Sequence, residues 1–345
     1  MSEKSLKKTV LLGLIAAAAV GAAGCSPADP LNWLIASGDA AEQIRQLTVL
    51  VMVLGALVFV AVEGLLIYAL LRFRRSAPAD QLPPQVHGHT RLEVAWTMVP
   101  VLILVVIAVP TVRTVFSLAT PPDANPLRVE VIGHQWWWEF RYPDIVPGKT
   151  ITTANELRIP VGRTVVASVT SADVIHSFWV PRLAGTIDVI PGKQVNQVWF
   201  NAREPGEYYG WCKEFCGTQH AQMRFRVVAV PQAEFDRWVQ TRLSPPAVPA
   251  SGQARQGYEL FGQLGCSACH TIDGTPYQGK IGPNLTNIGE RSTVGAGLLP
   301  NDPDGQNLAR WIKDPQAFKP GVKMPTLGLS DAQVGAIVAY LKSLK

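Results

Sequence analysis

Two segments of this chain combine residue types that bind redox metals, and the first gathers sulfur and imidazole groups. It holds Cys212, Cys216, His220 and Met223, and His176 lies upstream. Soft thiolates, imidazoles and a thioether together suit copper. A mononuclear blue-copper site needs one cysteine, whereas two thiolates spaced C-x3-C can bridge two copper ions. Charge shared by two metals changes the geometry little when one electron arrives, which favours fast transfer.

Two other chemistries could use the same residues. Cys212 and Cys216 could form a disulfide outside the cell, and the two cysteines with His176 and His220 could bind zinc. The histidine and methionine that follow argue against the disulfide. Met223 and the β-strand pattern around it argue against zinc. We therefore expect a dinuclear copper site.

The second segment is Cys266-Ser-Ala-Cys269-His270, the spacing at which c-type haem is attached. The two thiols add to the haem vinyl groups, and the adjacent histidine binds the iron. Met324 is the only methionine after Met223, and it precedes the last predicted helix, as in class I cytochromes c. A Met/His pair raises the reduction potential. The alternative for the two cysteines is a redox dithiol.

The stretch Gly282-Pro283-Asn284-Leu285 also resembles class I cytochromes c. The resemblance implies that the Pro283 carbonyl accepts the Nδ1 proton of His270 and so fixes the imidazole ring. It covers residues 252–345, for which we expect an all-α domain. Ser330 and Gln333 have the spacing of a capping box at the start of its final helix.

The bulk composition excludes some classes of function. The net charge is only +5, and the basic residues concentrate near the N-terminus and beside one apolar segment, which argues against a nucleic-acid partner. Five cysteines, an odd number, argue against a simple disulfide framework. Most of the long apolar runs lie before Phe116, so the part of the chain after Phe116 has the composition of soluble domains.

The N-terminus has the pattern of a bacterial signal peptide. Lysines precede an apolar run at 10–20, and small residues lead to Cys25. We predict a lipoprotein-type signal peptide at 1–24 and lipidation of Cys25, although lipoprotein boxes usually have Leu where Ala22 stands. The alternatives are ordinary cleavage nearby, or an uncleaved signal with a free thiol.

Two longer apolar segments predict a transmembrane hairpin at 42–117, with helices at about 47–71 and 94–116. Arginines cluster in the connection between them, which places that connection in the cytoplasm. Both ends of the hairpin then lie outside a bacterial cytoplasmic membrane, together with everything after it. We expect multi-pass anchoring, with the metal-binding domains on the outer face.

Short alternating runs follow and predict a β-sandwich or Greek-key domain at 123–240. The strands expected are 127–132, 157–160, 164–170, 194–200 and 225–230. Residues 241–251 are rich in Pro, Ala and Ser and read as a linker.

Residues 42–239 resemble subunit II of the haem–copper cytochrome c oxidases, and the C-x3-C-x3-H-x2-M loop is the most specific match. The resemblance implies a cupredoxin-like fold and a two-copper CuA centre. In that centre His176 and Met223 are terminal ligands, Cys212 and Cys216 bridge, and His220 binds the second copper. The Glu214 backbone carbonyl completes the set.

Three further roles follow from the resemblance alone. The Glu214 side chain would reach a magnesium ion at the interface with subunit I. Trp136, in His134-Gln135-Trp136, would be the exposed indole through which an electron arrives. Glu93 would lie at the mouth of a proton channel into subunit I.

We therefore expect a subunit of a proton-pumping cytochrome c oxidase that passes electrons through haem c and CuA to subunit I, where oxygen is reduced. Subunit III would be a second partner, and a cytochrome c or bc-type complex the donor. The six histidines of the chain are too few for an oxygen or nitrous oxide site of its own. A nitric oxide reductase subunit and a tethered shuttle without an oxidase partner stay open as alternatives. A quinol oxidase subunit would lack the copper cysteines.

Overall fold

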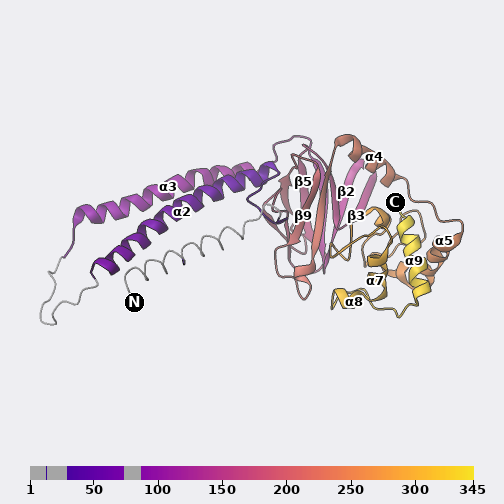
Figure 1. Ribbon diagram of the computed structural model, residues 1–345. Coiled ribbons are helices and arrows are strands. Elements are labelled where there is room, and N and C mark those ends of the chain that lie inside the picture. Colours follow the sequence, from indigo (N-terminus) through magenta and orange to yellow (C-terminus); the bar gives the residue numbers. More distant parts are fainter. Residues whose placement is uncertain (1–12, 14–28, 74–86) are drawn as a thin grey trace, which may run out of the picture. The chain divides into compact units, whose positions relative to one another are not determined.

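The computed structural model describes residues 13, 29–73 and 87–345 (Figure 1). The predicted signal peptide and Cys25 lie outside the described residues. The chain divides into two compact units, of which one spans Glu42–Thr120 and the other takes in the residues up to Ala41 and Pro121–Lys345.

The smaller unit contains most of two long apolar helices, α2 (Asp39–Arg72) and α3 (Thr90–Ala119). No residue of α3 is buried, and α2 buries only Ala40 and Ala41. Apolar side chains that point outward on all sides suit a lipid environment. Both helices are long and apolar enough to cross a membrane, which confirms the predicted pair. Each begins before its apolar stretch, because polar residues at the N-terminal side continue the helix.

The β domain consists of two five-stranded sheets. The first has the order β3-β2-β1-β5-β8 and the second β4-β10-β9-β6-β7. The pairs β1–β5 and β4–β10 are parallel, and the others are antiparallel. The strands are β1 (Leu127–His134), β2 (Trp137–Val146), β3 (Lys149–Ala154), β4 (Glu156–Pro160), β5 (Val165–Ser171), β6 (His176–Trp179), β7 (Thr186–Val189), β8 (Asn196–Phe200), β9 (Gly206–Cys212) and β10 (Arg224–Val230).

An aromatic core between the sheets fixes the strands that carry the candidate copper ligands. Phe178 on β6 stacks on Phe225 of β10 at a ring-centroid distance of 4.8 Å, and Trp138 of β2 packs on both rings. All three side chains are fully buried. Helix α4 (Gln232–Leu243) closes one edge of the core, where Trp238 lies 5.2 Å from Tyr142.

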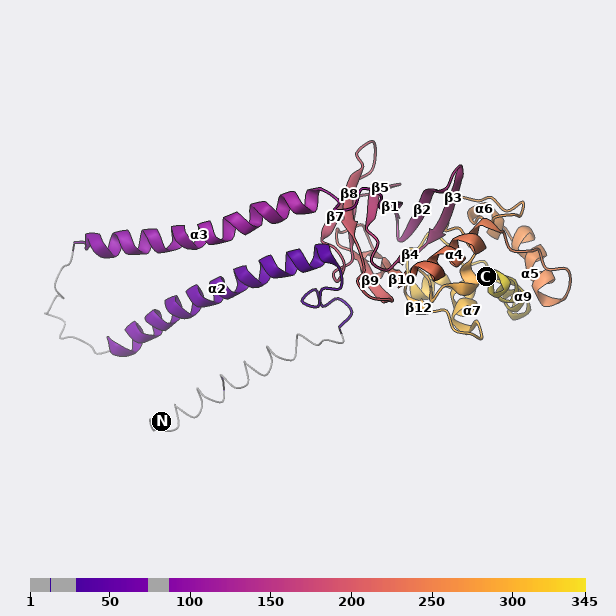
Figure 2. The same cartoon turned by 90° about the horizontal axis from the view of Figure 1, so that it is seen from above.

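The C-terminal domain is mainly helical, and Figure 2 shows its helices grouped beyond β3 and α4. It contains α5 (Gly252–Gln263), α6 (Cys266–Cys269), η2 (Ile288–Glu290), α7 (Gln306–Lys313), α8 (Pro315–Phe318) and α9 (Asp331–Ser343), with a small hairpin of β11 (Thr293–Val294) and β12 (Leu299–Pro300). Ser330 and Gln333 form the predicted capping box at the start of α9.

Helices α5 and α9 pack at very close range. A Cβ atom added to Gly257 would lie 1.9 Å from the carbonyl oxygen of Ala336, so only glycine fits there. Tyr258 on α5 meets Tyr340 on α9 edge-to-face, with ring centroids 5.5 Å apart. This pair of helices forms one wall of the helical core. The haem-attachment segment comes directly after α5 in the chain.

We expect Gly257→Ala to destabilise the C-terminal domain by about 1–3 kcal/mol, since the added methyl forces the two helices apart. Chemical denaturation of the full chain, followed by haem absorbance, measures this loss. Gly335→Ala is the matched control, because its Cβ would meet only the end of the Gln253 side chain, at 3.3 Å. Alanine favours a helix over glycine by up to about 1 kcal/mol. Equal stability of the two variants would contradict the close-packing account.

Candidate copper and haem sites

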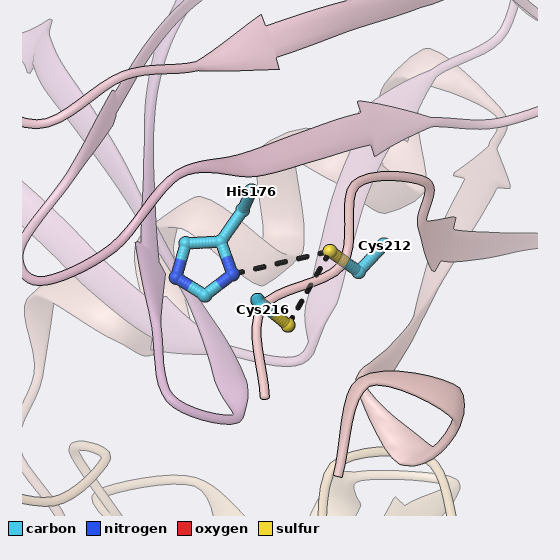
Figure 3. Close-up of side chains that lie close together, drawn as sticks. All are labelled: His176, Cys212 and Cys216. Atoms are coloured by element: carbon cyan, nitrogen blue, oxygen red, sulfur yellow. Dashed lines mark hydrogen bonds between the residues drawn. The ribbon is translucent and has the colours of Figure 1, made fainter. Parts of the chain in front are cut away.

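The sulfur and imidazole residues predicted from the sequence meet at one end of the β domain. His176 begins β6, and Cys212 ends β9 on the neighbouring strand. Figure 3 shows Cys216 on the loop that follows, with its sulfur turned toward Cys212. His176 Nδ1 lies 3.9 Å from the Cys212 sulfur, and the two sulfurs are 3.8 Å apart.

The remaining predicted ligands complete the cluster. His220 Nδ1 lies 3.6 Å and Met223 Sδ lies 3.7 Å from the Cys216 sulfur. The Cys212 sulfur lies 3.2 Å from the carbonyl oxygen of Glu214, whose side chain is exposed. A disulfide has sulfurs about 2.05 Å apart, and the two thiols are unbonded in this structure. Two thiolates, two imidazoles and a thioether around one point fit copper.

The cluster is shielded from water, and small residues make room for it. His176 and Met223 are fully buried. A Cβ atom added to Gly133 would lie 2.7 Å from His176 Cδ2, so glycine at the end of β1 admits the imidazole ring. The fold therefore buries these ligands and leaves room for the His176 ring.

The geometry of the two cysteines favours a state in which one is a thiolate and the other keeps its proton. The hydrogen bond with Cys216 and a weaker one with His176 outweigh the effect of burial and lower the pKa of Cys212 to about 4. The same interaction raises the pKa of Cys216, as does burial. One sulfur is thus a thiolate at neutral pH, and metal binding would displace the proton of the other.

Asp173 is a functional residue that the sequence analysis missed. Its Oδ1 atom lies 2.9 Å from His176 Nε2, and its Oδ2 atom accepts a hydrogen bond from the backbone N–H of Gln135 at 2.7 Å. Burial opposes ionisation of Asp173, but these hydrogen bonds hold its pKa below the usual value. A carboxylate behind a ligand histidine orients the ring toward the metal. An acidic residue three positions before the histidine was the available signal.

The haem-attachment residues surround a cavity of about 300 Å³ in the C-terminal domain. Cys266 and Cys269 line it from α6, together with His270 and Met324. Most of the other lining side chains are apolar. A cavity with two free thiols, one imidazole and one thioether fits a covalently bound haem.

The surroundings of His270 orient its imidazole ring and keep it neutral, as an iron ligand requires. Its Nδ1 atom lies 2.8 Å from the Pro283 carbonyl oxygen, in the arrangement that the sequence predicted. This bond leaves Nε2 as the nitrogen available to a metal. Burial lowers the pKa of His270, which favours the neutral ring that binds iron.

Trp136 connects the two sites. Its indole Nε1 donates a hydrogen bond to the carbonyl oxygen of Cys216 at 2.9 Å, and Trp136 also lines the haem cavity with its neighbours Gln135 and Trp137. We expected an exposed indole, but Trp136 is only 7% exposed. The expectation was wrong because the C-terminal domain covers this face of the β domain.

The described fold and side chains define a membrane-anchored chain with a cupredoxin-like metal domain and a cytochrome c domain. Three family descriptions match it: "Cytochrome C oxidase subunit II, transmembrane domain" over residues 30–114, "Cytochrome C oxidase subunit II, periplasmic domain" over 127–230, and "Cytochrome c" over 254–345. The three matches follow the order of the observed parts.

Two relatives that match most of the chain agree with these family descriptions. Cytochrome c oxidase subunit 2 of Alkalihalophilus pseudofirmus is 38% identical and covers 93% of each chain, and that of Bacillus sp. strain PS3 is 36% identical over 79% of each. The crystal structure of the periplasmic domain of subunit II from Bradyrhizobium japonicum is 36% identical, covering 36% of this chain and 97% of that one, with a TM-score of 0.33. The chain belongs to the cytochrome c oxidase subunit II family, in a form that carries a cytochrome c domain.

Cys216→Ser should abolish the copper spectrum and leave the haem c spectrum intact, because Cys216 is central to the first cluster only. Optical and EPR spectra of the purified chain measure both. Loss of both spectra in an otherwise folded protein would contradict two separate sites.

Asp173→Asn should weaken copper binding by roughly 10- to 100-fold, the usual effect of removing a carboxylate behind a ligand histidine. Competition with a copper chelator measures the affinity. Asp188→Asn is a suitable comparison, since Asp188 is an exposed residue of β7 that pairs with Ser177, next to His176 in β6. Equal affinity of the two variants would mean that Asp173 does not orient His176.

Met324→Ala should remove the absorbance band typical of Met–Fe(III) ligation while the haem stays attached through Cys266 and Cys269. Persistence of that band would identify another axial ligand.

Proposed function

We propose that this chain takes electrons from an external donor at its cytochrome c domain and delivers them, by way of a dinuclear copper centre, to oxidase subunit I. When bound, haem c and the copper pair supply one-electron carriers. Cys266, Cys269, His270 and Met324 hold the haem. His176, Cys212, Cys216, His220, Met223 and the Glu214 carbonyl hold the copper.

One observation supports this order most strongly: Trp136 lies in the wall of the haem cavity and also bonds to the backbone of Cys216. The side chain therefore spans the space between the two candidate sites. Its burial excludes a diffusing protein from direct contact with Trp136. External electrons would then arrive through the cytochrome c domain rather than at the indole.

The oxygen-reducing centre must lie in a partner. Of the six histidines, three belong to the two sites, and His134 stacks on Trp137 at 4.1 Å. The two membrane helices would bind subunit I, and subunit III would complete a proton-pumping complex that reduces oxygen to water. A cytochrome c or a bc-type complex would be the donor.

Two carboxylates would act at the contact with subunit I. Glu93 lies in the first turn of α3, where its Oε1 atom accepts a hydrogen bond from the backbone N–H of His89 at 3.1 Å. We propose it as part of the mouth of a proton channel. The exposed Glu214 side chain would reach magnesium. The arginines between the helices support a cytoplasmic connection, with both outer domains on the opposite face of the membrane.

The experiment that separates the oxidase from a nitric oxide reductase uses the purified complex with a reduced donor. We expect oxygen uptake coupled to donor oxidation, and its loss in Cys216→Ser. Reduction of nitric oxide without oxygen uptake would replace the oxidase assignment by the reductase. A preparation that contains no second subunit and consumes neither gas would favour a tethered shuttle.

A further inference from the structure

The segment Lys319–Lys323 of the cytochrome c domain contacts the β domain at several points. Gln219, in the copper-ligand loop, donates a side-chain hydrogen bond to the Pro320 carbonyl oxygen at 2.7 Å. Lys323 lies 3.4 Å from Asp173, the carboxylate behind His176. Met324, the predicted haem ligand, follows directly in the chain. This segment therefore lies between the two candidate sites.

Lys319 makes the most deeply buried of these contacts. Its ammonium group donates to the carbonyl oxygen of Trp136 at 2.8 Å and to that of Gly295 at 3.3 Å. The residue is 1% exposed, and it lines the haem cavity. Gly295 belongs to the cytochrome c domain and Trp136 to the β domain. The Lys319 side chain therefore bonds to the backbone of both domains at the wall of the haem cavity.

Burying a lysine between two domains has a large free-energy cost. Removing an ammonium from water costs several kcal/mol, and apolar residues of similar volume usually serve stability better. Burial and the nearby Arg224 lower the pKa of Lys319 to about 7. Even the neutral amine has two N–H groups for its two carbonyl acceptors. What lysine provides here is a directed bond to one backbone atom.

That backbone atom belongs to the residue that spans the two sites. Lys319 holds the Trp136 carbonyl, and the Trp136 indole donates to the carbonyl of Cys216. We propose that Lys319 is a positioning residue for electron transfer, which fixes Trp136 between the haem cavity and the copper-ligand loop. This inference rests on the function proposed above.

Lys319→Met in the full-length complex tests the proposal, because methionine keeps an unbranched side chain but removes the donor. Lys313→Met is the matched control, since Lys313 is in the same domain and its side chain is 53% exposed. The first readout is hydrogen exchange at residues 134–138 and 293–297. Loss of this buried hydrogen bond should speed exchange there roughly 10- to 100-fold, and the control should not change it.

The second readout is the rate at which an electron placed on the haem by a photoreductant reaches copper. We expect a fall of roughly 10- to 100-fold in Lys319→Met, with both spectra retained, since a displacement near 1 Å at a positioned group can cost up to about 100-fold. Where Lys319→Met fails to bind haem or copper, Lys319→Leu replaces it with the same expectations, because leucine also lacks a donor.

Wild-type exchange or a wild-type transfer rate in the Lys319 variant would overturn the positioning role while leaving the proposed function intact. Failure of the unmodified complex to transfer the electron at all would instead contradict the proposed function.

Discussion

The hydrogen bond from the Trp136 indole to the Cys216 carbonyl is the contact on which both candidate sites depend. It ties the last residues before β2 to the loop that carries the copper ligands. Gln135 donates to the same oxygen at 2.8 Å, and its backbone N–H reaches Asp173, which orients His176. A short segment therefore supports ligands from both sides of the cluster and forms a wall of the haem cavity.

Polar contacts between the β domain and the cytochrome c domain hold the two domains in one relative orientation, in addition to the linker that joins them. A flexible tether would give only an effective concentration of about millimolar order. Here buried Glu156 also accepts a hydrogen bond from Ser292 Oγ at 2.8 Å, and Lys319 bonds to the Trp136 carbonyl. Buried polar groups with specific partners favour one relative orientation over many. A fixed orientation keeps the distance for electron transfer constant.

The sequence predicted which side chains come together better than it predicted how the two outer domains contact each other, for physical reasons. Soft ligands at close spacing indicate a metal-binding loop without any knowledge of the fold. The side chains predicted to bind copper lie together, and those predicted to hold haem line one cavity. Strand β6 was missed because it has only four residues and no long alternation. The burial of Trp136 and the role of Lys319 could not be predicted, since both depend on contacts between residues 183 positions apart.

The most direct test of this account is the distance between the oxidised haem and copper centres in the full-length chain, measured by pulsed EPR. A cytochrome c domain docked against Trp136 predicts one narrow distance distribution. It should not change when the linker is lengthened within 244–251, the part of the predicted 241–251 segment that follows the end of α4. A broad distribution, or one that shifts with linker length, would show that the domain moves freely and would contradict the account.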